Sequence, residues 1–281
     1  VNLSNRANTD MTDDYPDHAL AAECKAVSRI NPDLEAKARN HLDSLTKPKG
    51  SLGRLEDIAA RLFAIQGETP LQAKPARMLT IAADHGVVAE GVASSPREVT
   101  RLMVANFLRE GAAINCLCRA AGAQLKVVDA GVDADPLPGH PLYVDAKIAR
   151  GTRNMAQGPA MTDEQCTQAL RLGVSLAEEA RKDGVRVLGT GEMGIGNTTA
   201  SSALLCAFLG FSPEEMSGMG AGVPKSGPGH HTRVIQQAPH INADAVAPGL
   251  PSRILAAAVG LLIAALPRST HGGTVAVDGC C

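Results

Sequence analysis

The stretch that decides the fold is Gly189-Thr-Gly-Glu-Met-Gly-Ile-Gly-Asn-Thr-Thr199. It lies between an apolar run at 185–188 and an apolar stretch at 198–209, which predicts a glycine-rich turn from a strand into a helix. Glycines let backbone amides approach an anion, and the amino terminus of a helix favours phosphate. The stretch therefore predicts a phosphate cradle, with Asn197 or Thr198 capping the helix.

The same glycines allow two other interpretations. Gly189, Gly191 and Gly194 match the GxGxxG pattern of dinucleotide-binding loops, and Glu214 and Glu215 follow about 20 residues on. A dinucleotide would place its pyrophosphate beside the carboxylate of Glu192, and like charges repel. The other alternative is a turn that only allows tight packing. We rank the phosphate cradle first and the dinucleotide loop second.

Outward from this stretch, short apolar runs alternate with helical patterns. Strands are predicted over 78–83, 126–128, 185–188 and 274–277, and helices over 98–109, 112–121, 162–182 and 198–209. This alternation is typical of a parallel sheet with crossover helices, so we predict a Rossmann-like α/β fold. Ligands of such sheets bind outside the carboxyl ends of the strands, and the loops there are expected to converge on one site.

The chain is expected to have three parts. Residues 1–16 are polar and unpatterned, and we interpret them as a mobile arm. Helices predicted over 33–45 and 51–66 form a small helical lobe within 17–70, and the α/β nucleotide-binding domain spans 71–281.

The composition argues against nucleic acid and membranes as partners. The chain has 281 residues, a net charge of −2, two Tyr, four Phe and no Trp, so neither a basic surface nor stacking platforms are expected. The longest apolar run, 254–266, is shorter than the roughly 20 residues of a membrane span, and the polar start resembles no signal peptide. We expect a cytoplasmic protein with a small-molecule ligand.

The seven cysteines form no CxxC pair and no zinc-binding spacing. We interpret them as reduced thiols. Cys116 and Cys118 lie in a predicted helix, where buried small hydrophobes are more common than metal ligands.

Several loop residues have both a functional and a structural interpretation. Asp84 and His85 follow a predicted strand as a proton-transfer pair or, more often in such positions, a structural hydrogen-bonded pair. Glu192 is either a solvated loop carboxylate or a carboxylate held near a cationic or proton-donating ligand. The aspartates after the second strand suggest magnesium ligands or turn formers: Asp129, Asp133 and Asp135.

Five blocks of the sequence resemble the nicotinate-nucleotide:dimethylbenzimidazole phosphoribosyltransferases. They are KPKGSLGRLEDIA (47–59), ADHGVVAEGVASSPREVT (83–100), VDAGVDAD (128–135), ARGTRNMAQGPAMT (149–162) and GTGEMGIGNTTASSA (189–203). The resemblance implies transfer of ribose phosphate from nicotinate mononucleotide to a benzimidazole, without a metal or another cofactor. It also implies a Rossmann-like sheet with a helical lobe, in a homodimer.

The resemblance also implies roles for individual residues. Ser95 would line the benzimidazole pocket, and Glu192 would be one of two glutamates near the reacting centre. The nucleotide would be surrounded by Gly191, Gly194, Asn197, Thr198, Thr199, Gly218 and Gly220.

The sequence departs from the family at several points. Met103 stands where many relatives have a glutamine near the benzimidazole, and His231 stands where the family usually has a phosphate-contacting lysine. The match is expected to break after Gly222, and the segment that carries the family's main proton acceptor does not follow Cys281. Asp278 is then a weak substitute catalyst, and slow turnover is expected. A noncatalytic nucleotide-binding relative and an NAD-dependent oxidoreductase are the alternatives.

Overall fold

The computed structural model describes residues 30–67, 70–137, 139–217, 228–241 and 274–277. Its centre is a sheet of five strands in the order β3-β2-β1-β4-β5, and every neighbouring pair is parallel. The strands are β1 (Ala76–Ala83), β2 (Ala123–Gly131), β3 (Tyr143–Asp145), β4 (Val187–Met193) and β5 (Thr274–Val277). The predicted α/β fold with a parallel sheet is confirmed.

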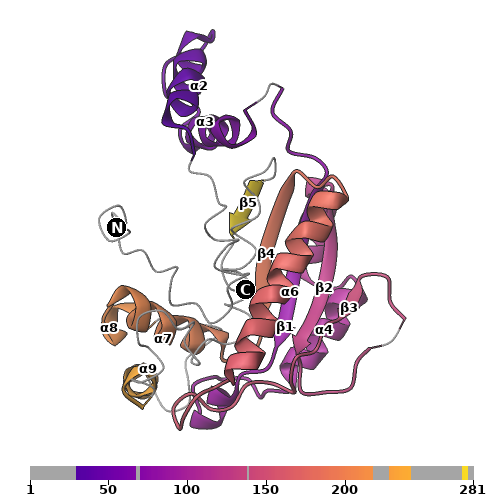
Figure 1. The fold of residues 1–281 in the computed structure, drawn as a ribbon, viewed down its shortest axis with the longest axis vertical. Helices are drawn as coiled ribbons and strands as arrows, with labels where there is room; N and C mark the ends of the chain where they lie inside the picture. The colour runs from indigo at the N-terminus through magenta and orange to yellow at the C-terminus, as the bar shows by residue number, and fades with distance from the viewer. Residues whose placement is uncertain (1–29, 68–69, 138, 218–227, 242–273, 278–281) are drawn as a thin grey trace.

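Helices cover both faces of the sheet (Figure 1). The described helices are α2 (Pro32–Ser44), α3 (Arg54–Gln66), the 3-10 helix η2 (Gly86–Glu90), α4 (Val99–Leu108), α5 (Ala113–Ala121), α6 (Asp163–Lys182), α7 (Asn197–Leu209), α8 (Pro213–Met216) and α9 (Pro228–Ile241). The six helices predicted between residues 33 and 209 are present, with ends that differ by a few residues.

Alternation along β1 separates two hydrophobic cores. Leu79 and Ile81 point into a core that includes α6, α7 and α9, whereas Ala82 belongs to a second core with α4 and α5. Residues two apart in a strand share a face, so one strand serves both layers. Figure 1 shows α6 in front of the sheet and α4 behind it.

The glycine-rich stretch differs from its predicted form. β4 extends to Met193 because it pairs with β1 as far as Ala82↔Met193, so Gly191 and Glu192 are strand residues. Helix α7 begins at Asn197, and its cap is Gly196 in the left-handed conformation (φ 89°). The prediction of an Asn197 or Thr198 cap is therefore wrong.

The strand β3 was not predicted. It has only three residues and pairs with β2 from Val127↔Tyr143 to Asp129↔Asp145. A strand this short has no recognisable alternation of its own, and its existence depends on the neighbouring strand.

Other predictions have mixed outcomes. Cys118 is buried but Cys116 is exposed, so the prediction of burial holds for one of the two. Within the described residues no helix is long and apolar enough to cross a membrane. The predicted arm (1–16), the apolar run 254–266 and Gly218, Gly220 and Asp278 lie outside the described residues, and the boundary between the helical lobe and the α/β domain stays a prediction.

Candidate functional site

The sheet order places the candidate site between β1 and β4. From β1 the chain continues to β2 on one side and later returns to β4 on the other side. Open parallel sheets bind ligands at such a switch point, beyond the carboxyl ends of the strands. Here β1 ends before Asp84 and His85, and β4 ends at Met193, immediately after Glu192.

Three side chains form a buried hydrogen-bonded group at this point, which we call the Glu192 cluster: His85, Glu192 and Asn197. His85 Nε2 lies 3.0 Å from Glu192 Oε1, and Asn197 Nδ2 donates to Glu192 Oε2. The exposed fractions of the three residues are 0%, 3% and 6%. The end of β1, the end of β4 and the first turn of α7 are thus joined through one carboxylate.

The interpretation of Glu192 as a solvated loop carboxylate is wrong. Its side chain is 2% exposed, and each of its oxygens has a partner. Among the described residues no Lys or Arg forms an ion pair with it. The expected pairing of Asp84 with His85 is also wrong, because Asp84 Oδ2 accepts from the backbone N–H of Asp133, 2.8 Å away, while His85 faces Glu192.

Gly194 allows the turn after β4 to lie directly against the end of β1. A Cβ at this residue would lie 2.2 Å from the carbonyl oxygen of Ala83, 2.6 Å from Glu192 Oε1 and 2.7 Å from His85 Cδ2. These separations are too short for any side chain. The structural reason for this glycine is therefore contact with β1 and the Glu192 cluster, in addition to any approach of an anion. A Cβ at Gly191 would meet nothing within 4 Å.

Helix α4 is attached to the same turn. The hydroxyl of Thr100, which is fully buried, accepts from the backbone N–H of Ile195 at 3.1 Å. Ser95 precedes this helix and Met103 lies within it; both are partly exposed, and Met103 packs against the core that includes Met193 and Ile195. The structure thus places the segment with these two predicted pocket residues beside the β4–α7 turn.

The first turn of α7 also contacts α9. Thr199 Oγ1 and His231 Nε2 are 2.7 Å apart, and both residues are buried. Thr198, between the two buried residues Asn197 and Thr199, is partly exposed. His231 is thus a neighbour of the predicted phosphate cradle, as the resemblance implies for its position.

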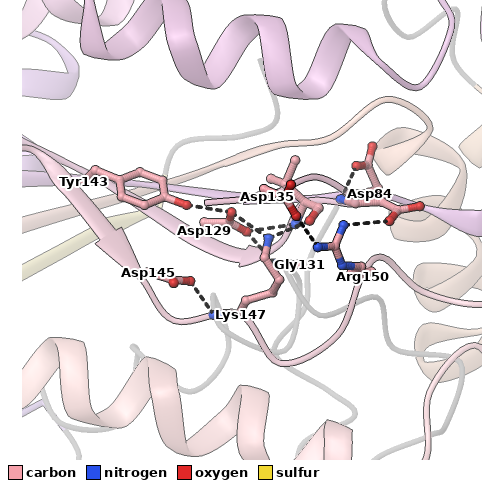
Figure 2. Close-up of polar contacts among 10 residues, drawn as sticks. Asp84, Asp129, Gly131, Asp135, Tyr143, Asp145, Lys147 and Arg150 are labelled. Carbon is pink, nitrogen blue, oxygen red and sulfur yellow. Dashed lines mark hydrogen bonds and ion pairs between the residues drawn. The ribbon is translucent and has the colours of Figure 1, made fainter. Parts of the chain in front are cut away.

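On the other side of β1, the predicted aspartates form ion pairs (Figure 2). Asp129 accepts from the backbone N–H groups of Gly131 and Val132, from Tyr143 at 2.8 Å and from Lys147 Nζ at 2.7 Å. We call Asp129, Tyr143 and Lys147 the Asp129 cluster. Burial raises the pKa of Tyr143, and the neighbouring Asp129 raises it further, so the phenol remains a hydrogen-bond donor.

The two aspartates in the loop after β2 contact arginines. Asp133 pairs with Arg97, and Asp135 accepts from Arg150 at 2.5 Å. Among the described residues no group of three or more His, Cys, Asp or Glu side chains could hold a metal ion. Asp129 is thus an ion-paired strand residue, because β2 extends to Gly131, whereas Asp133 and Asp135 are ion-paired residues of the loop that follows. The magnesium interpretation has no support among the described residues.

The block that begins near Ala149 joins the same edge of the sheet. The backbone N–H of Gly151 donates to Gly131 at 2.9 Å, and that of Thr152 donates to Asp84 at 2.9 Å. The hydroxyl of Thr152 accepts from the backbone N–H of Gly86 at 3.1 Å. The predicted convergence of loops is confirmed for the blocks after β1, β2 and β4.

Sequence reasoning missed the partners that hold these residues. The contacts His85–Glu192 and Thr100–Ile195 span 107 and 95 residues, and Lys147 binds Asp129 across 18. The sequence identifies His85 as a polar residue after a strand, but only the adjacency of β1 and β4 identifies its partner. No feature of the sequence indicates that Lys147 is the partner of Asp129.

Comparison with known proteins identifies the family. A family model described as "Phosphoribosyltransferase" matches residues 27–276. A nicotinate-nucleotide–dimethylbenzimidazole phosphoribosyltransferase from Nitratidesulfovibrio vulgaris (strain DP4) is 50% identical over 268 residues, which cover 93% of this chain and 75% of that protein. Its counterpart from Solidesulfovibrio magneticus is 52% identical over 265 residues, 92% of this chain and 75% of that protein.

Solved structures agree with these matches. CobT from Thermus thermophilus superposes with a TM-score of 0.78 at 40% identity and covers 88% of this chain and 75% of that chain. The family match continues to residue 276, so the expected break in resemblance after Gly222 is wrong. The chain belongs to the phosphoribosyltransferase family of which these nicotinate-nucleotide–dimethylbenzimidazole enzymes are members.

Proposed function

We propose that this chain transfers the phosphoribosyl group of nicotinate mononucleotide to dimethylbenzimidazole, releasing nicotinate and forming α-ribazole 5′-phosphate for cobalamin assembly. The observation that carries the proposal is a family match over residues 27–276 that includes the whole switch-point site. The relatives at about 50% identity bear the name of this activity.

The site chemistry suits such a transfer. The pyridinium of the donor leaves as a neutral base, so the leaving group needs no general acid. The attacking benzimidazole must be oriented and must lose its N–H proton, and a fixed carboxylate serves both purposes. We propose that Glu192 is such a carboxylate, since it lies at the switch point and no lysine or arginine among the described residues neutralises it.

The proposed cradle for the phosphate is the β4–α7 turn with the amino terminus of α7. Gly194, Asn197, Thr198 and Thr199 belong to this segment, and helix amino termini favour anions. Ser95 and Met103 are proposed to line the benzimidazole side, because Thr100 between them is bonded to the turn.

The dinucleotide alternative is less compatible with the fold. Gly189 and Gly191 are paired within the sheet, as Met78↔Gly189 and Thr80↔Gly191, so they do not form a loop around a pyrophosphate. In the dinucleotide fingerprint the glycines belong to the turn after the strand. Only Gly194 of the three lies in that turn.

The test is to mix the purified chain with nicotinate mononucleotide and dimethylbenzimidazole and to follow nicotinate by chromatography. We expect release that depends on both substrates, and a fall in kcat of about 10²-fold or more for Glu192→Gln with a smaller change in donor affinity. Saturable donor binding without nicotinate release would support the noncatalytic alternative. Unchanged turnover in Glu192→Gln would remove Glu192 from the proposed chemistry.

We also propose that the chain forms a homodimer in the cytoplasm, as the resemblance implies. Leu102 on α4 and Leu117 on α5 are 61% and 64% exposed, which is consistent with an apolar contact surface. Light scattering coupled to size-exclusion chromatography tests the dimer, and a monomer at micromolar concentration would contradict it.

A further inference from the structure

His85 is a buried titratable side chain whose partner the sequence did not indicate. It is 0% exposed and lies directly after β1, and its Nε2 is 3.0 Å from Glu192 Oε1. We propose that His85 is a positioning residue that fixes the orientation of the Glu192 carboxylate for proton transfer. This proposal rests on the proposed function.

The ring has little freedom to move. The Cβ position of Gly194 lies 2.7 Å from His85 Cδ2, and that of Gly196 lies 3.6 Å from His85 Cβ. The backbone of Gly194 therefore lies against the imidazole, and that of Gly196 lies beside the Cβ of His85, so the side chain is enclosed between the end of β1 and the start of α7. Because the donor is fixed in place, its hydrogen bond also fixes the orientation of the acceptor.

The hydrogen bond defines the tautomer of His85. A carboxylate oxygen accepts, so Nε2 carries the proton and donates to Glu192. Nδ1 is buried without a hydrogen-bond partner among the described residues. An unsatisfied buried nitrogen has a free-energy cost, and an apolar residue that only filled this space would avoid it.

Glu192 can still accept a substrate proton in this arrangement. Each carboxylate oxygen has two lone pairs, and His85 and Asn197 use one on each oxygen. Because each oxygen has its own partner, the two contacts together restrict rotation of the carboxylate plane. Small errors in the placement of a reacting group reduce rates strongly, so loss of one donor is expected to affect turnover more than donor binding.

The experiment compares two substitutions at the same residue in the full chain. His85→Gln keeps an N–H donor near the position of Nε2, whereas His85→Phe keeps a ring and loses the donor. We expect His85→Phe to lower kcat about tenfold or more while the Kd for nicotinate mononucleotide changes less than about threefold. We expect His85→Gln to recover most of the lost kcat. His85→Asn, whose amide is too short to reach Glu192, replaces the Phe variant if that protein does not fold.

Two outcomes would overturn the proposal: a kcat near that of the wild type in His85→Phe, or a rate in His85→Gln as low as in His85→Phe. Nitrogen NMR of the histidine rings gives a second readout that needs no turnover. We expect His85, assigned by its absence in His85→Gln, to be protonated at Nε2 and to change its signal in Glu192→Gln. An Nδ1-protonated ring would overturn the contact itself. A wild-type chain with the expected NMR signal but no nicotinate release would instead contradict the proposed function.

Discussion

Two buried carboxylates lie at the same edge of the sheet and are held in different ways. Asp129, near the end of β2, has a lysine at 2.7 Å, a tyrosine hydroxyl and two backbone N–H donors. Glu192, at the end of β4, has an imidazole and an amide, and no Lys or Arg among the described residues pairs with it. Their side chains are 4% and 2% exposed, so burial does not distinguish them.

The difference concerns charge compensation. A buried carboxylate with a cation and a full set of donors is stabilised by the fold itself and has little remaining capacity to bind a ligand. A buried carboxylate without a lysine or arginine partner remains able to bind a ligand that brings a positive charge or a proton. The comparison assigns a structural role to the Asp129 cluster and supports the proposed chemical role of the Glu192 cluster.

The largest expected effect is the loss of stability when the cation of the Asp129 cluster, Lys147, is removed. Lys147→Met leaves the Asp129 carboxylate buried without its cation, and we expect the free energy of unfolding to fall by about 3–5 kcal/mol. Urea denaturation monitored by circular dichroism measures it. Asp129→Asn in the same chain should restore part of the loss, because the charge is removed with its partner.

An exposed ion pair provides the control for this prediction. Arg119 and Glu110 pair at 2.8 Å with side chains 56% and 61% exposed. Arg119→Met is expected to cost less than about 1 kcal/mol. If Lys147→Met were no more destabilising than Arg119→Met, the Asp129 cluster would contribute no more to stability than an exposed ion pair. The contrast between the two carboxylates would then disappear.

A smaller effect, on the affinity for nicotinate mononucleotide, is expected when a methyl group is added beside the Glu192 cluster. Gly194→Ala places a Cβ 2.2 Å from the Ala83 carbonyl oxygen and 2.6 Å from Glu192 Oε1, so the turn or the carboxylate must move. We expect affinity for nicotinate mononucleotide to fall about tenfold, or 1.4 kcal/mol, as measured by calorimetry.

Gly158→Ala is the control, because a Cβ there meets nothing within 4 Å and the residue has no assigned role in binding. The folded structure should accept it without movement of the Glu192 cluster. Equal affinities for the Gly194→Ala and wild-type proteins would mean that the position of the turn does not govern binding.

The smallest expected effect is on the pH dependence of the free energy of unfolding, and it concerns Asp84, which lies between the two clusters. Burial raises the pKa of Asp84 above its ordinary 3.8, against the lowering by the Thr100 hydroxyl and the charge of Arg97. The folded state therefore binds this proton more tightly than the unfolded state. The contribution of Asp84 to stability falls as pH rises from about 3.8 through the folded pKa.

Asp84→Asn removes this dependence, so in urea titrations its stability relative to the wild type should increase as the pH rises above 3.8. Asp183→Asn should change in the opposite direction and at lower pH, because its stability relative to the wild type should increase as the pH falls below 3.8. A hydrogen bond from Arg77 lowers the pKa of Asp183, so the wild type gains stability from Asp183 above pH 3.8 and loses it as pH falls through the folded pKa. The same sign for both variants would contradict the assigned cause at Asp84.

The sequence alone determined the local elements and the family. Apolar runs and capping residues predicted most strands and helices to within a few residues; for α6, the Thr162 side chain accepts from the Gln165 N–H at its start. The glycine-rich stretch located the β4–α7 turn, and the resemblance located Glu192 and its neighbours. These features depend on residues close together in the chain, where composition and spacing are informative.

Only the tertiary structure decided what each of these residues binds. The placement of β1 between β2 and β4 brings His85 to Glu192 and Asp84 to the loop after β2, whereas the adjacency of Asp84 and His85 in the chain predicts that they pair with each other. Pairing with β1 also converted Gly191 and Glu192 from loop to strand. Strand order and hydrogen bonds across about a hundred residues result from packing the two cores, and no local pattern of residues encodes them.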